Sequence, residues 1–254
     1  MAMATATASA SLLLLLTACG GGTDDGDAAA SQPPPSPSSS STPTASPDET
    51  EPGTETEGDA APESGEKSQV NVEEVILTQG DLAEFQITES PGGDRDVPPT
   101  KARPASCQPV ENLRLDAYAP APTATARRFA VATTGDYRGT GTTITLTSFT
   151  TAQAEKMMAD LRAAVTKCAS GYAGGALTFS EVRKLDSVPV GDEAVSFHLT
   201  GRANPTSYTL VRQGSILIRL SSAVGTGGEA EVPQPVMVQQ VMKIQAAEAR
   251  DTAS

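Results

Sequence analysis

Apolar residues are distributed very unevenly along this chain of 254 residues. Five consecutive leucines occupy residues 12–16, whereas residues 20–69 contain no aromatic, sulfur-containing or branched apolar side chain. From about Val72 onward, such side chains recur at short and regular intervals. A packed core requires this recurrence, so the pattern predicts one folded domain over residues 72–250.

Alternation of apolar and polar residues predicts antiparallel strands in this domain. Phe85 and Ile87 indicate a first strand, and the clearest hairpin joins two alternating arms through the glycine-rich turn 135–141. The side chains predicted to share the buried face of the hairpin are Phe129, Val131 and Thr133 on one arm and Ile144, Leu146 and Ser148 on the other. Further strands are predicted over residues 177–185, 191–199, 208–212 and 216–220.

Two segments have the three- and four-residue spacing of amphipathic helices. The stronger one runs from Thr151 to Cys168, and the other begins at Pro235. Strands combined with two amphipathic helices predict an α+β domain, in which both helices pack on an antiparallel sheet.

Shorter elements are predicted before the hairpin. Residues 73–80 indicate a short helix closed by a glycine. A second short helix is predicted behind Pro109, although Leu113 and Leu115 have the spacing of a strand. Residues 90–104, with four prolines, are predicted to form a surface loop.

The segment between the leucine run and the domain has a distinct composition and charge. It is rich in Ser, Thr, Pro and acidic residues, so residues 19–71 are predicted to be a disordered tether. Residues 1–70 carry 11 acidic residues and one lysine, a net charge of −10, whereas residues 71–254 carry 20 acidic and 17 basic residues, a net charge of −3. Neither part has the basic surface that nucleic-acid binding requires, so no nucleic-acid partner is expected.

The leucine run ends in Leu16-Thr17-Ala18-Cys19, which resembles the lipobox of bacterial lipoprotein signal peptides. The resemblance implies a signal peptide at residues 1–18, a diacylglyceryl group on Cys19, and a lipid anchor in the outer face of the cell membrane. The run is too short for a spanning helix, which needs about 20 apolar residues. Residues 1–10 contain no Lys or Arg, so we expect the true start codon upstream or the basic end lost. The alternative is an apolar N-terminus that arose by chance.

If Cys19 carries lipid, Cys107 and Cys168 remain as a pair in an exported protein. Export to an oxidising compartment predicts a disulfide between them. Closing this loop of 62 residues would stabilise the fold by about 4 kcal/mol on the chain-entropy model. The alternative is two separately buried thiols. A metal site is not expected, because such sites need three or four ligands and the chain has one histidine.

No catalytic constellation is recognisable, and no cofactor is expected. The sequence contains neither a Gly-x-Ser-x-Gly nor a His-Glu-x-x-His motif. His198 lies on a predicted strand, opposite the apolar face, and is predicted to be a polar surface or edge residue. Asp192-Glu193 is interpreted as a strand start in preference to a cation site, and Arg127-Arg128 as a solvated edge in preference to a patch for an acidic partner.

Several short motifs of the domain, over about residues 72–247, are similar to actinobacterial lipoproteins and receptor-kinase ectodomains of the PknH-like sensor type. These motifs are Leu77-Thr78-x-x-Asp81-Leu82, Cys107-x-Pro109, the helix ending at Cys168, Gly191-Asp192-Glu193-Ala194, Val211-x-x-Gly214 and Gln240-x-x-Lys243. The resemblance implies an α+β extracellular domain with a cleft proposed to bind a ligand, usually with two disulfides. This chain has cysteines for one.

The sequence therefore predicts a lipid-anchored, extracytoplasmic, non-catalytic module that binds or senses an envelope component or a small molecule. An alternative is a structural protein that docks an envelope partner, and an enzyme is the third hypothesis. Sequence alone names no ligand-binding residue.

Overall fold

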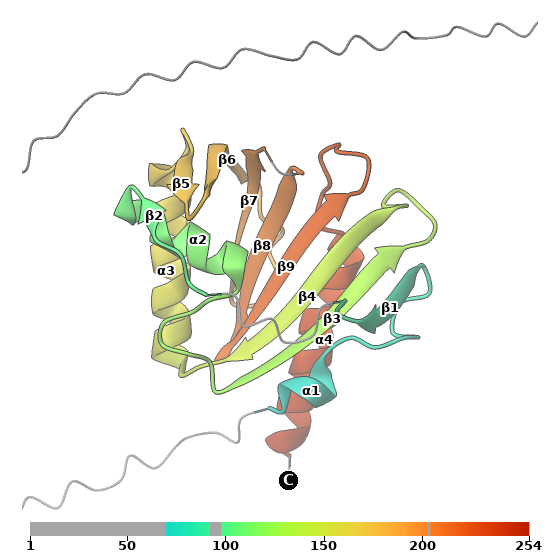
Figure 1. The fold of residues 1–254 in the computed structure, drawn as a ribbon. Coiled ribbons are helices and arrows are strands. Elements are labelled where there is room, and N and C mark those ends of the chain that lie inside the picture. Colours follow the sequence, from blue (N-terminus) through green and yellow to red (C-terminus); the bar gives the residue numbers. More distant parts are fainter. Residues whose placement is uncertain (1–69, 92–97, 203, 254) are drawn as a thin grey trace, which may run out of the picture. The chain divides into compact units, whose positions relative to one another are not determined.

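A nine-stranded antiparallel sheet organises the domain in the computed structural model, with the strand order β1-β3-β4-β9-β8-β7-β6-β5-β2 (Figure 1). The structure describes residues 70–91, 98–202 and 204–253. The predicted signal peptide and Cys19 lie outside these residues, as does the predicted tether apart from Val70 and Asn71. All described residues belong to one compact unit.

The sheet and its helices confirm the predicted α+β class. The strands are β1 (Phe85–Glu89), β2 (Ala102–Arg103), β3 (Ala124–Ala132), β4 (Thr140–Ser148), β5 (Tyr172–Gly174), β6 (Leu177–Leu185), β7 (Glu193–Gly201), β8 (Thr206–Gln213) and β9 (Ile216–Val224). The helices are α1 (Val72–Val75), α2 (Gln108–Leu115), α3 (Thr151–Lys167) and α4 (Gln234–Asp251), with a 3₁₀ turn at Ala105–Cys107.

The helices cover opposite faces of the sheet, and each face has its own hydrophobic cluster. Figure 1 shows α4 behind the strands and α2 in front of them. On β9, Ile218 joins the cluster under α4 and α1, whereas its neighbour Leu217 joins the cluster under α2 and α3. Successive strand residues point to opposite faces, so a single strand supplies both clusters.

Local sequence explains where the two long helices begin. Thr150 caps α3 through a capping box with Gln153, and Pro235 lies in the first turn of α4. The helix predicted from Thr151 to Cys168 is confirmed, with Cys168 as its C-cap.

The structure corrects two predictions of short elements and decides a third that was open between helix and strand. The helix predicted over residues 73–80 ends at Val75, because Ile76 and Leu77 are buried in an extended segment. The segment behind Pro109 is a helix and not a strand. The loop predicted over residues 90–104 contains β2, which pairs with β5; its residues 92–97 lie outside the described part.

The predicted hairpin is β3 and β4, but the buried face of β3 was assigned wrongly. Ala126, Ala130 and Ala132 are buried on the α4 face, and Phe129 and Val131 are only half-buried on the other. The helix α4 covers the face with the smaller side chains, which alternation cannot reveal. Ile144 and Leu146 of β4 are buried as predicted.

Within the described residues, no helix combines the length and apolar character needed to cross a membrane.

Candidate functional site

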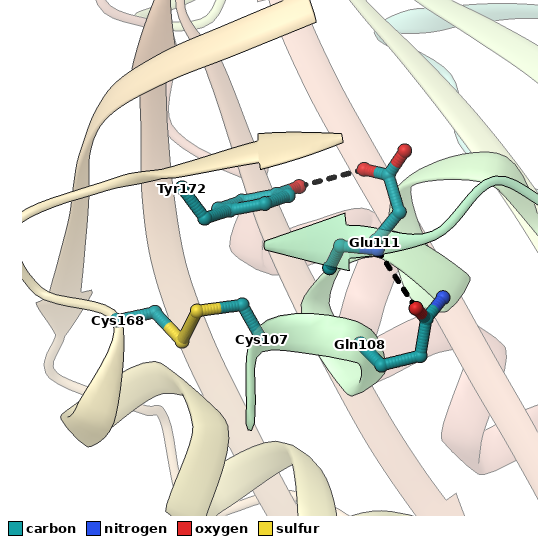
Figure 2. Close-up of a disulfide and its surroundings, with 6 residues drawn as sticks. Cys107, Gln108, Glu111, Cys168 and Tyr172 are labelled. Atoms are coloured by element: carbon teal, nitrogen blue, oxygen red, sulfur yellow. Dashed lines mark hydrogen bonds between the residues drawn. A yellow bond between two sulfur atoms is a disulfide. The ribbon is translucent and has the colours of Figure 1, made fainter. Parts of the chain in front are cut away.

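The predicted disulfide is present and fixes both ends of the region around α2. Cys107 directly precedes α2, Cys168 caps α3, and both sulfur-bearing residues are buried. Figure 2 shows the bridge beside Gln108 and Tyr172. The bond therefore holds the start of α2 against the end of α3.

A buried carboxylate, Glu111, links α2 to the neighbouring strands. It accepts two hydrogen bonds of 2.8 Å from Arg114, one of 2.9 Å from the Tyr172 hydroxyl (Figure 2), and one from the Thr100 hydroxyl. Burial alone would raise the pKa of Glu111, but these bonds outweigh it and lower the pKa below its usual value. Because all of its oxygens are engaged, Glu111 serves to position α2.

A row of polar side chains crosses the sheet beside α2. The strand register places Arg127 of β3 opposite Thr145 of β4, and Thr145 opposite Arg219 of β9. Directly opposed residues in an antiparallel sheet lie on one face, about 5 Å apart. We call Arg127, Thr145 and Arg219 the arginine row.

Arg219 is a buried cation at the C-terminal end of α2, with 7% of its surface exposed. Its Nε donates to the Leu113 carbonyl at 2.6 Å and its Nη2 to the Arg114 carbonyl at 3.1 Å. Its guanidinium lies 5.4 Å from the centre of the Tyr208 ring. In the described part of the chain, no carboxylate forms an ion pair with it. The partial negative charge of the helix end and the aromatic ring therefore offset part of this charge.

Two residues that follow α2 cover the arginine row. Asp116 adopts the left-handed conformation (φ 59°) and its Oδ2 lies 2.8 Å from Nη2 of Arg127. Tyr118 packs edge-on against Phe149, with ring centres 5.6 Å apart. Burial, followed by the negative charge of Asp116, raises the pKa of Tyr118, so its hydroxyl stays protonated.

Unpaired polar atoms are concentrated at this place. Among the described residues, four buried side-chain atoms have no hydrogen-bond partner, and three of them are Asp116 Oδ1, Tyr118 OH and Thr145 Oγ1. A buried polar atom without a partner costs about 1–3 kcal/mol. The Tyr118 hydroxyl interacts with the Asp116 carboxylate, so these two residues partly complement each other. The Thr145 hydroxyl then marks a place that a polar molecule completes.

A small pocket between α2 and α3 adjoins the cluster. It has a volume of about 80 Å³, and its apolar walls include Leu113, Met157, Leu161 and Leu210. Leu210 lies directly opposite Arg219 in the sheet, and the Tyr118 ring forms another wall. The pocket and the arginine row are thus neighbours with Tyr118 between them.

A larger pocket of about 250 Å³ lies between α3 and the ends of β6 and β7. Val165, Leu185 and Val195 form its apolar part, and Lys184 and Asp186 are exposed at its edge. Its buried hydroxyl, on Ser196, is already bonded to Thr209 at 2.9 Å. It offers space, but none of the unpaired buried atoms lines it.

His198 is not the surface or edge residue that the sequence predicted, because only 1% of it is exposed. It does lie opposite the apolar face, but residues 229–230 cover it. Its Nδ1 donates to Ser207 Oγ at 2.9 Å, because the Ser207 hydroxyl itself donates to the Ala230 carbonyl. Its Nε2 has no hydrogen-bond partner and lies 3.6 Å from Glu229 Oε1.

Ser207, His198 and Glu229 have the residue types of a hydrolase triad but not its geometry. The Ser207 hydroxyl is buried and committed to a carbonyl, and Glu229 is held by Arg183 through two hydrogen bonds of 2.9 and 2.8 Å. A nucleophile must reach a substrate, and a base must accept its proton. These bonds therefore hold residues 229–230 over His198.

Two charged pairs from the sequence are used structurally. Glu193 starts β7, as predicted, and binds both Arg162 and Arg212, while Asp192 also binds Arg212. Burial opposes ionisation of Glu193, but the two arginines outweigh it and lower its pKa. The prediction of a solvated edge at Arg127-Arg128 is wrong, since both are half-buried and paired with Asp116 and Glu73.

Sequence reasoning missed the residues of the site itself. Arg219 stands between Ile218 and Leu220 in a strand that is apolar on both faces, and a charge at such a place signals a buried cation. Thr145 and Tyr118 carry no comparable signal. Lipid attachment at Cys19 stays a prediction. Within the described residues, no three metal-binding side chains are grouped.

Comparisons with known proteins gave structural likenesses only. No family model and no curated protein matches the chain. The extracellular domain of PknH from Mycobacterium tuberculosis aligns with 13% identity and a TM-score of 0.45, over 68% of this chain and 94% of that domain. A putative uncharacterized protein from Mycobacterium smegmatis, the Rv0999 ortholog, aligns with 12% identity and a TM-score of 0.36, over 66% of this chain and 90% of the other.

Proposed function

We propose that this protein is a non-catalytic binding module on the outer face of the cell membrane, anchored by lipid on Cys19, that takes up a small ligand at the C-terminal end of α2. The observation that carries the binding role is the grouping of three unpaired buried polar atoms beside an apolar pocket. Ligand sites combine an apolar cavity with a few convergent polar groups in this way.

Two features support the extracytoplasmic placement. The disulfide between Cys107 and Cys168 is of a kind that persists in oxidising compartments. The Leu16-Thr17-Ala18-Cys19 tetrapeptide supplies an attachment point, and a polar segment of about fifty residues separates it from the domain. Such a segment gives the domain reach from the membrane surface.

The binding role is tested by a thermal-shift screen of the purified full-length chain against small molecules, followed by mapping of each hit on amide NMR signals. We expect hits that shift the signals of residues 108–119. A screen without any stabilising compound, or hits that map only elsewhere, would refute the site.

The anchor is tested independently by mass spectrometry of the protein isolated from its own cells. We expect a mature N-terminus at Cys19 with a mass increase that corresponds to a diacylglyceryl group. An unmodified Cys19 would contradict the anchor but would leave the ligand site unaffected.

A further inference from the structure

Building on the proposed function, we infer that the ligand is a small carboxylic acid: its carboxylate binds Arg219 and Thr145, and its short apolar tail occupies the pocket between α2 and α3. The inference names a ligand class for the site and rests on charge, on hydrogen-bonding capacity and on the shape of the pocket.

The charges of the cluster do not cancel. The positive groups are Arg114, Arg127 and Arg219, whereas the negative groups are Glu111 and Asp116. Arg114 is paired with Glu111, and Arg127 with Asp116. The charge of Arg219 is left over, in a buried position, where an unpaired charge is costly. One negative charge completes the cluster.

The free hydrogen-bonding groups nearest to Arg219 also favour an acceptor. Thr145 stands between two arginines in the row, and its hydroxyl has no acceptor. Arg219 uses two of its five donors on carbonyls and also interacts with the Tyr208 side chain, so it retains donors for a ligand. A carboxylate presents two oxygens, and it therefore accepts from Thr145 and Arg219 together.

The adjoining pocket sets the size of the tail. Its volume of about 80 Å³ is well below the ~150 Å³ of a dry cavity that holds benzene. A short aliphatic tail therefore fits and an aromatic ring does not. Tyr118 separates the pocket from the row. Its ring packs against Phe149, and its hydroxyl lies near the Asp116 carboxylate without a hydrogen bond of normal geometry. Displacement of this ring would expose the arginine row to the pocket.

Asp116 Oδ1 favours a ligand that also carries a hydrogen-bond donor. Asp116 Oδ1 accepts no hydrogen bond of normal geometry, although the Tyr118 hydroxyl lies near this carboxylate, whereas Oδ2 is held by Arg127. A plain carboxylate offers no donor, but a hydroxyl on the carbon next to the carboxylate does. We therefore expect 2-hydroxy acids to bind more tightly than the corresponding plain acids.

The test is an NMR titration of the full-length chain with butyrate, 2-hydroxybutyrate and the neutral isostere butyramide, each at millimolar concentration. We expect both acids to shift the amide signals of residues 108–119 and of Leu210, and butyramide to bind at least tenfold more weakly, as loss of a charge-assisted bond predicts.

Matched variants locate the effect. Thr145→Val replaces the unpaired hydroxyl with a methyl group and should weaken butyrate binding several-fold. Thr147→Val is the control, because Thr147 lies on the same face two residues further on and its hydroxyl already donates to the Leu217 carbonyl. Arg219→Gln should abolish the preference for acids, and an unchanged amide spectrum elsewhere shows that this variant is folded.

The outcomes separate the two proposals. If butyramide binds as tightly as butyrate, or if Thr145→Val and Thr147→Val bind alike, the acid is the wrong class while the binding module stands. If the acids bind only at residues outside the cluster, the inference is also overturned. If neither the acids nor any compound of the thermal-shift screen binds at α2, both proposals fail.

Discussion

The two faces of the sheet differ in how completely their buried polar groups are paired. Under α4, the Gln240 side chain accepts from Leu77 N and donates to the Val75 carbonyl, and Lys243 binds Asp81 and the Ile76 carbonyl. Under α2, a buried arginine lacks a carboxylate partner and three polar atoms lack any partner. The first face is arranged for stability, whereas the second retains unfavourable features of the kind found at functional sites.

The fourth unpaired atom is an exception on the α4 face. It is Nε2 of His198, which lies on the α4 face of β7 but under the chain at Glu229 and Ala230. The helices α4 and α1 contribute no unpaired buried atom among the described residues. The polar groups that α4 itself covers are therefore paired, whereas His198 lies under an irregular segment of the same face.

The largest expected effect comes from removing the disulfide on the α2 face. The variant Cys107→Ala with Cys168→Ala should lose about 4 kcal/mol of unfolding free energy on the chain-entropy model. Urea denaturation measures this loss, and the unmodified protein in reducing buffer should show the same loss. Hydrogen exchange should rise more in α2 than in α4. Equal rises in both helices would contradict the assignment of the bridge to the α2 face.

The next effect compares the two faces within one strand. Leu217 and Ile218 are neighbours on β9, both fully buried, and they belong to different clusters. Leu217→Ala and Ile218→Ala should each cost about 3 kcal/mol in urea denaturation. Because both clusters share the sheet, we expect a single transition in each variant. A second transition in either variant would show that the faces unfold separately.

A third comparison contrasts a paired and an unpaired polar group. Gln240→Leu leaves Leu77 N and the Val75 carbonyl buried without partners, so it should cost about 2–3 kcal/mol. Tyr118→Phe removes a hydroxyl that lies near Asp116 but forms no hydrogen bond of normal geometry, so it should change the unfolding free energy by less than about 1 kcal/mol. Equal losses from the two changes, measured by urea denaturation, would refute the difference between the faces.

The sequence predicted the elements of both faces better than the contacts between them, and the physical reason is periodicity. Regular spacing identified α3, α4 and most strands, because apolar burial repeats with the geometry of each element. The paired contacts of Gln240 and Lys243 with residues 75–81 span about 165 positions, and no local pattern contains such distances.

The candidate site depends still more on tertiary structure. Arg127, Thr145 and Arg219 meet only because the strand order places β4 between β3 and β9. The pairing of the cysteines was predictable because two remained after Cys19. The burial of His198 was not predictable, because the residues that cover it, Glu229 and Ala230, lie in an irregular segment.

The smallest expected effect concerns His198 and the pH. Burial lowers the pKa of His198 below its ordinary 6.5, although the nearby Glu229 charge opposes this, Arg183 reinforces it and Glu181 again opposes it. As the pH falls below 6.5, His198 becomes protonated in the unfolded chain before it does so in the folded protein. The free energy of unfolding therefore declines. Between pH 7 and pH 5.5 stability should fall by no more than about 1.2 kcal/mol, the limit for a histidine that stays neutral in the folded protein.

The His198 effect can be separated from carboxylate titration. Glu111 and Glu193 have lowered pKa values, so their contributions are lost only as the pH falls through the ordinary value of 4.5 and below. Asn in place of His198 retains a donor for Ser207 but has no titrating group. Urea denaturation at the two pH values should therefore show the decline in the native protein and not in His198→Asn. A rise in native stability would instead mean that protonated His198 pairs with Glu229, and Glu229→Gln would then remove that rise.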